Sequence, residues 1–171
     1  MINWFQRKFN FNDLEGTLPS ILERLHDAPL RLEAKISTIP ERVYTQRLGE
    51  LWTIQEQVGH LVDLEPLWEN RFKDFLKGKE VLTEADLSNT KTHQGGHNEK
   101  NMQDLLKEFR DKRLTLCLVL KSFGPKAEQW QSKHPRLGTP MRPIDLAYFV
   151  AEHDDHHLAK VSQLHQELMA S

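Results

Sequence analysis

Residues 152–157 read EHDDHH and lie near the C-terminal end of the chain. His153 and His157 are four residues apart, so in a helix both imidazoles project from one face, about one turn from each other. Apolar side chains continue this face in steps of three or four residues on both sides of the pair: Ala147, Val150, Val161, Leu164 and Leu168. The pattern predicts an amphipathic helix from Pro143 to about Met169, with both histidines turned toward a protein core.

Two further segments have helical periodicity, residues 18–37 and residues 101–122. Pro29 lies inside the first of them. A proline within a helix removes a backbone donor and crowds the preceding turn, so we expect a break or a kink at this position. The second segment is followed by Gly124-Pro125, a pair that stops helices.

The remaining helix, which is second along the chain, is expected to start at Thr53, because Thr53 and Glu56 have the spacing of a capping box. Apolar residues at helical spacing extend this helix to about Lys77, and Gly78 follows as a C-terminal stop. Pro66 falls inside the pattern, but the strength of the periodicity predicts one continuous helix.

Four long amphipathic segments predict an all-α protein, and the expected architecture is a four-helix bundle that forms a single domain over residues 1–171. Two long irregular connections, residues 78–100 and 123–142, join the helices. Extended alternation of apolar and polar residues flanked by turns is absent, so no strands are expected. A chain of 171 residues can bury a sizeable core.

The composition indicates a soluble globular protein. Hydrophobic residues make up 38% of the chain and charged residues 28%, and the formal net charge of −2 with no block of Lys or Arg argues against a nucleic-acid partner. No apolar stretch is long enough to cross a membrane, and residues 1–12 lack the features of a secretory signal. The aromatic residues of this N-terminal segment are expected to pack onto the domain: Trp4, Phe5, Phe9 and Phe11.

Cys117 is the single cysteine, so an intrachain disulfide is impossible and a cytoplasmic location is expected. It lies within an apolar run of residues 114–120, and we interpret it as a small buried hydrophobic residue rather than a nucleophile.

A third histidine, His60, also lies on an apolar helix face, with Leu64 and Leu67 following it at helical spacing. A polar group in a core costs free energy unless it has a partner, and three inward imidazoles could share one divalent cation. Three histidines leave a coordination position for water or substrate, as in catalytic zinc sites. Their other ring nitrogens need acceptors, and Glu56, Glu152 and Asp154 are candidates.

The alternative is that these histidines are ordinary core or surface residues, since an H-x-x-x-H pair alone is a weak signal. His156 is expected beside the site or at its rim. His93 and His97 have ligand-like spacing, but Gly95-Gly96 between them argues against a helix, so we place both in a loop near the mouth of the site. Surface or turn positions are expected for three others: His26, His134 and His165. Protease, hydrolase and nucleotide-binding motifs such as H-E-x-x-H, G-x-S-x-G and the P-loop are absent.

Residues 52–61 (WTIQEQVGHL) and 152–159 (EHDDHHLA) resemble the DinB-like family of bacterial proteins, which includes bacillithiol-transferase-like and maleylpyruvate-isomerase-like bundles. The resemblance extends over nearly the whole chain. It implies an up-down-down-up four-helix bundle with metal ligands at His60, His153 and His157. It also implies a divalent ion, commonly zinc or nickel, and frequent homodimers.

Three functions are compatible with these patterns. The first is an enzyme whose metal activates water or a small thiol for hydrolysis or transfer, with Glu56 either a base beside the site or the carboxylate of the capping box. The second is a non-catalytic metal-binding or stress-response protein, in which His156, His97 or an acidic side chain closes the site. The third is an interaction module with histidines that are merely buried.

Overall fold

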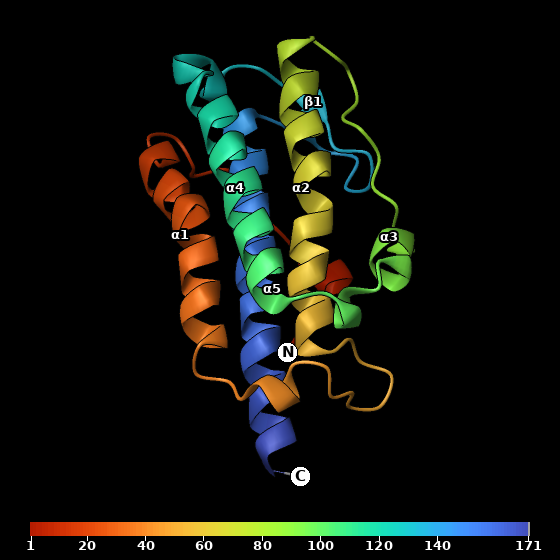
Figure 1. Ribbon diagram of the computed structural model, residues 1–171. Helices are drawn as coiled ribbons and strands as arrows, with labels where there is room; N and C mark the ends of the chain where they lie inside the picture. The colour runs from red at the N-terminus through yellow and green to blue at the C-terminus, as the bar shows by residue number, and fades with distance from the viewer. Residues whose placement is uncertain (171) are drawn as a thin grey trace.

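The computed structural model describes residues 1–170 and confirms the predicted all-α four-helix bundle (Figure 1). Each predicted helix boundary lies within one residue of the observed boundary. The long helices are α1 (Leu18–Ile36), α2 (Ile54–Leu76), α4 (Met102–Lys121) and α5 (Pro143–Ala170). The capping box at the start of α2 is formed in both directions, by Thr53 and Glu56.

Helices α1 and α5 run in one direction and α2 and α4 in the other, which confirms the up-down-down-up topology (Figure 1). Each helix packs against two neighbours, and α2 lies beside α4, to which it is parallel. Because these two helices are consecutive long helices, the connection between them must return along the bundle. It contains the short helix α3 (Thr90–Gln94) and the 3₁₀ helix η3 (His97–Glu99), both packed on α2.

The core consists of two apolar clusters, one toward each end of the bundle. Trp68, Phe72 and Phe149 belong to the first cluster, and Leu61 and Val161 belong to the second. Buried polar residues lie at the intermediate positions of the helices: His60, Glu65, Arg113, His153, Asp154 and His157. The bundle therefore has a polar layer in its middle.

Of the break or kink expected at Pro29, the break is wrong, because α1 continues through this residue, and the kink stays a prediction. A proline leaves the carbonyl four residues earlier without its helical donor. Here that carbonyl belongs to Leu25, and Arg113 of α4 donates to it from Nη1 over 3.2 Å. The bundle thus supplies the missing hydrogen bond. Pro66 lies within α2, which is continuous as predicted.

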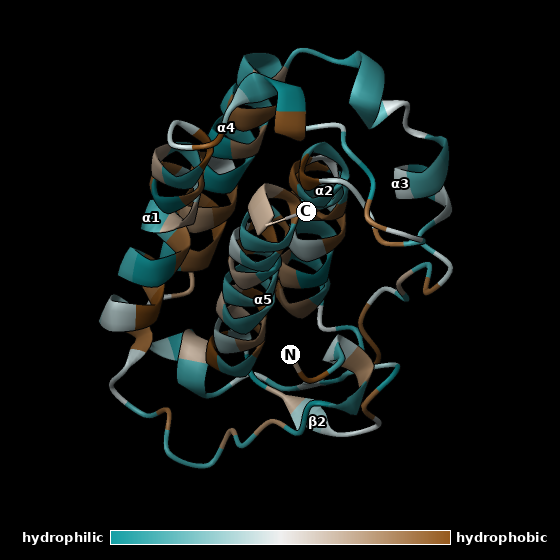
Figure 2. Ribbon diagram, turned by 90° about the horizontal axis from the view of Figure 1, so that it is seen from below, coloured by the Kyte–Doolittle hydropathy of each residue, from teal (hydrophilic) through white to brown (hydrophobic). Residues whose placement is uncertain are grey.

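The connection between α4 and α5 contains strands that the sequence pattern did not predict. After the 3₁₀ helix η4 (Gly124–Glu128), β1 (Ser132–Lys133) pairs antiparallel with β2 (Pro140–Met141). Two-residue strands are too short to produce a recognisable alternation. In the view along the bundle, α3 and β2 lie outside the four long helices (Figure 2). Within residues 1–170, no helix is both long and apolar enough to cross a membrane.

The N-terminal segment packs onto the bundle through aromatic contacts. Trp4, in the 3₁₀ helix η1 (Trp4–Gln6), lies with its ring centroid 5.1 Å from those of Phe9 and Phe149. Phe11 contacts Tyr148, whereas Phe5 remains half exposed. The expected packing is therefore confirmed for Trp4, Phe9 and Phe11, and Phe5 packs only in part, with Arg136 over its ring.

Candidate metal centre

The packing of α2 against α5 brings the three predicted histidines together. Each of the three residues, His60, His153 and His157, is buried and contributes one ring nitrogen to the cluster. These three nitrogens lie within 4.8 Å of one another. The ring centroids of His153 and His157 are 4.4 Å apart, and that of His60 lies 4.6 Å from the His157 centroid. Residues almost 100 positions apart in sequence thus form one cluster.

Gln57 determines which ring nitrogen of His157 carries the proton. Its Oε1 lies 2.7 Å from His157 Nδ1, and because an amide oxygen only accepts, Nδ1 carries the hydrogen. The lone pair of His157 is therefore on Nε2, which lies 3.2 Å from Nε2 of His153. Two ring nitrogens thus face each other at a separation that suits ligands of a common cation.

A hydrogen-bonded chain orients His60 in the same way. Its Nδ1 lies 3.0 Å from Thr92 Oγ1, and Thr92 donates its hydroxyl hydrogen to Asp63 Oδ2 over 3.1 Å. The Thr92 oxygen therefore accepts from Nδ1–H of His60, which leaves the Nε2 lone pair for a ligand. Asp63 Oδ2 also contacts His97 Nε2 at 2.8 Å. These supporting residues come from α2, α3 and η3. The sequence analysis did not identify Asp63 or Thr92, and it named His97 only as a loop residue or as a ligand that could close the site.

The acidic residues that we expected to support the histidines contact other groups. The Glu56 carboxylate accepts from Thr53 N, Arg47 and Asn98, as a capping carboxylate does. No hydrogen bond in the described part of the chain joins it to a histidine.

Arginines engage all three acidic residues of the EHDDHH stretch, and Asp155 pairs with Arg24 and Arg31. Glu152 pairs with Arg7 and with Arg24, and Asp154 pairs with the buried Arg113. The expectation that Glu152 or Asp154 accepts from the histidines is therefore wrong, because helix α5 turns both carboxylates toward neighbouring cations.

The histidine rings are neutral at physiological pH. Burial lowers the pKa of His60 to about 4 and lowers the pKa values of His153 and His157 well below the ordinary value. His153 lies edge-on to Trp4 and Trp68, and its buried Nδ1 has no hydrogen-bond partner within residues 1–170. Three neutral, converging imidazoles are a donor set that fits a divalent ion such as zinc.

The cluster forms part of the wall of a cavity of about 610 Å³. Trp4 and Phe5 of the N-terminal segment and Trp52 also border this cavity. Its other walls are partly apolar and partly polar, with exposed acidic residues at Glu50, Glu84 and Asp86 and with these further side chains: Leu64, Leu67, Trp68, Arg71, His134, Arg136 and Phe149. A small molecule in the cavity would therefore reach the three histidines directly.

His97 differs from its expected position near the mouth. It is buried behind α2, where a Cβ on Gly59 would lie 2.2 Å from its Cγ, so only glycine allows this approach. His93 is exposed on α3, with its ring edge toward Trp52. The expectation that both histidines lie in a loop is therefore wrong, because His93 is in α3 and His97 begins η3, although Gly95 and Gly96 do separate the two short helices.

His134 lies in the turn of the β1–β2 hairpin, as expected, but it is buried rather than on the surface. Its Nε2 lies 3.0 Å from Arg71 Nη1, and the turn folds it into the cavity wall. His26 is exposed and His165 is partly exposed, whereas His156 is buried beside Trp4 and borders the cavity.

Acid is expected to destabilise the metal-free protein between pH 6.5 and about 4. An unfolded histidine has a pKa of about 6.5, whereas burial lowers the pKa of His60 to about 4. In this interval the unfolded chain binds more protons, so the free energy of unfolding falls as the pH falls. For His60 alone the loss is on the order of 3 kcal/mol. Urea unfolding with a chelator present measures it, and a flat profile from pH 7 to 5 would contradict the expectation.

The fold and site define a bundle protein with a buried histidine cluster at an open cavity, and the comparisons with known proteins agree with this class. The sequence of residues 24–161 matches the family model of the DinB superfamily, so the chain belongs to this superfamily. The chain is also similar to a solved structure described as "YfiT from Bacillus subtilis is a probable metal-dependent hydrolase with an unusual four-helix bundle topology". The TM-score is 0.81 at 15% identity, over 95% of this chain and 93% of that chain. A comparison with curated proteins gave no match.

Proposed function

We propose that the chain binds one divalent metal ion, zinc or nickel, through His60, His153 and His157 and is a metal-dependent hydrolase or thiol-dependent transferase. The observation that carries this proposal is that neutral imidazoles converge at the wall of an open cavity. When bound, such an ion acts as a Lewis acid and lowers the pKa of a bound water or thiol. Gln57 and Thr92 would hold two of the rings in the ligand tautomer.

Two features favour a catalytic site over a structural one. Within residues 1–170 no fourth His, Cys, Asp or Glu joins the cluster, so a metal held by the three histidines would keep a position for water or substrate. The Trp4, Trp68 and Phe149 rings border the cavity and give it an apolar wall beside the histidines. YfiT, which shares the fold, is described as a probable metal-dependent hydrolase, and this supports the hydrolase alternative.

A thiol in the proposed transfer reaction would come from a substrate. Cys117 is buried in the first apolar cluster, and burial raises the pKa of its thiol to about 11, so it is not a nucleophile at neutral pH. The residues that border the cavity do not include it.

The proposal is tested by measuring turnover with metal-free protein and with protein reloaded with zinc or nickel. The substrates are a panel of small esters and amides, and a panel of thiols combined with electrophilic acceptors. We expect turnover in one panel to depend on the metal and to disappear with a chelator. Equal rates with and without metal in every reaction would reject catalysis and favour a non-catalytic metal-binding role.

A further inference from the structure

Two arginines in the cavity wall lack an anionic partner. Arg71 is only 2% exposed, and its Nε donates to the carbonyl of Thr83 over 2.8 Å. Arg136 borders the same cavity, and its buried Nη2 has no hydrogen-bond partner in the described residues. Among the ion pairs of residues 1–170, none includes either arginine. Arg71 is buried and Arg136 partly buried, and the Asp74 carboxylate acts on Arg71 only through its charge, without an ion pair. Because buried charges in proteins are normally paired, this arrangement favours an anion from solution.

Aromatic rings hold both guanidinium groups in place. Arg71 lies over Trp68 at 5.3 Å from its ring centroid, and Arg136 lies 5.3 Å from the Phe5 centroid and 5.9 Å from the Phe149 centroid. Rings of this kind orient an arginine through cation–π attraction while they leave its N–H groups free. The two side chains are therefore positioned before any ligand binds.

His134 supports Arg71 without neutralising it. An arginine only donates, so Nε2 of His134 accepts from Nη1 of Arg71. Burial, together with the charges of Arg71 and Arg136, lowers the pKa of His134 to about 3, so this ring stays neutral. Burial and the charge of Arg136 also lower the pKa of Arg71 to about 10, which still leaves it charged at neutral pH.

Acidic residues border the cavity but do not pair with these arginines. Asp86 is exposed and accepts hydrogen bonds from Ser88 and Thr90. Glu84 is exposed and forms no ion pair within the described chain with Arg71 or Arg136. The positive charge in the wall is thus left for a group that enters from solution.

We propose that Arg71 and Arg136 form a subsite for an oxyanion, a carboxylate or a phosphate, carried by a small organic ligand. The apolar part of that ligand would lie against Leu64, Leu67 and Trp68, and its other end would reach the three histidines. The planar guanidinium group of an arginine matches the geometry of both oxyanions. That this ligand is the substrate rests on the proposed function, whereas the subsite itself does not require a metal.

Calorimetric titration of the metal-free protein at pH 8 tests the subsite, because the cavity histidines are then neutral. The probes are phenylacetate, phenyl phosphate and the uncharged 2-phenylethanol. We expect at least one anion to bind roughly 10–100-fold more tightly than the alcohol, as hydrogen bonds to a charged group allow. The tighter of the two anions identifies the ligand class. Equal binding of all three probes would overturn the proposal.

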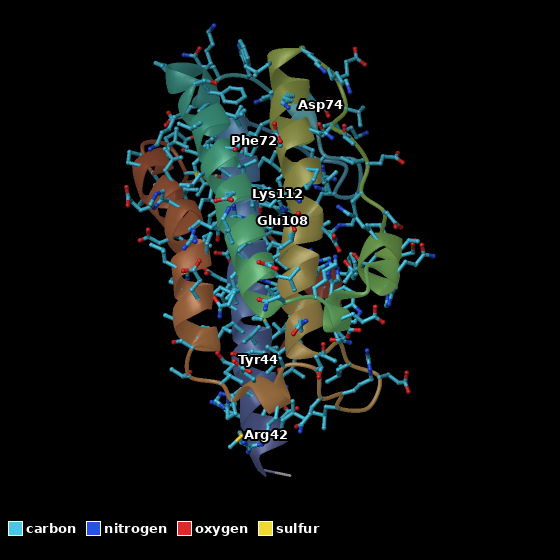
Figure 3. The ribbon with its side chains drawn as sticks, viewed as in Figure 1. Arg42, Tyr44, Phe72, Asp74, Glu108 and Lys112 are labelled. Atoms are coloured by element: carbon cyan, nitrogen blue, oxygen red, sulfur yellow. The ribbon has the colours of Figure 1, made fainter. Side chains whose placement is uncertain are left out.

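Variants locate the binding. Arg136→Gln and Arg71→Gln are each expected to weaken the anion roughly tenfold or more and to leave 2-phenylethanol unchanged. Arg42→Gln is the control, because Arg42 is exposed and far from Arg71. Asp74, about one helical turn from Arg71, lies at one end of the bundle, and Arg42 lies at the other (Figure 3). If Arg71→Gln does not fold, Arg136→Gln and Arg71→Lys carry the test. Unchanged anion affinity in Arg136→Gln would reject the subsite.

Zinc titration of the same proteins separates this inference from the proposed function. The arginine variants are expected to bind zinc as the unmodified protein does. Protein that binds the anions but no zinc would remove the metal proposal and leave the subsite intact. Protein that binds zinc but neither anion would overturn the subsite alone.

Discussion

Replacing His153 with alanine is expected to reduce the zinc affinity of the protein by at least about 100-fold, because removal of a residue that merely supports a ligand already costs 10–100-fold. The reason is geometric. His153 Nε2 faces His157 Nε2 at 3.2 Å, and within residues 1–170 no other His, Cys, Asp or Glu belongs to the cluster that could replace it. Elemental analysis of untagged protein is expected to give about one ion per chain before the substitution and little after it.

A graded series makes this prediction specific. Gln57→Ala removes the acceptor that fixes the His157 tautomer, and we expect it to weaken zinc roughly 10–100-fold. His165→Ala is the control, because His165 is partly exposed further along α5 and does not belong to the cluster. Circular dichroism checks that each variant remains helical. Equal metal content in the His153 and His165 variants would refute the ligand assignment.

The four helices and the inward orientation of the histidines could be predicted from periodicity. A histidine that continues an apolar stripe faces the core, and the four helices of a bundle share one core. Periodicity therefore predicts that His60 and His153 both face this core, but it does not fix their level along the bundle. That they meet at one metal site is what the resemblance of the two histidine motifs to DinB-like proteins implied.

The supporting residues could not be predicted, because they depend on the path of a connection that has no periodicity. Thr92 and His97 contact the site only because the return from α2 to α4 folds back along α2. The close approach of His97 at Gly59 is a packing detail with no signature beyond the glycine itself. Likewise, the continuity of α1 at Pro29 depends on a donor from another helix.

That donor, Arg113, belongs to a fully buried ion triad. It forms two hydrogen bonds with Glu65, including one of 3.3 Å from Nε, and two with Asp154, including one of 3.1 Å from Nη2. All three side chains are at most 2% exposed. The triad lies between the two apolar clusters and links α2, α4 and α5, while the bond to Leu25 adds α1.

Replacing Arg113 with methionine is expected to destabilise the protein by about 3–5 kcal/mol, because the change leaves two carboxylates buried without a cation. Burial already raises the pKa values of Glu65 and Asp154 with the arginine present, so desolvation is the dominant force on both. Urea unfolding of the metal-free protein measures the loss. Arg110→Met on the same helix is the control, since its pair with Glu33 is partly exposed to solvent and is worth about 0–1 kcal/mol.

The cost of the single substitution comes from the unpaired carboxylates rather than from a large net gain of the intact triad. The triple variant Arg113→Met, Glu65→Leu, Asp154→Leu is therefore expected to recover most of the lost stability, because apolar residues of similar size replace buried ion pairs at little cost. Acid separates the two contributions further, since protonation of Glu65 and Asp154 removes the unpaired charge and narrows the gap between Arg113→Met and the unmodified protein. A triple variant as unstable as the single one would show instead that the triad itself holds the four helices in register.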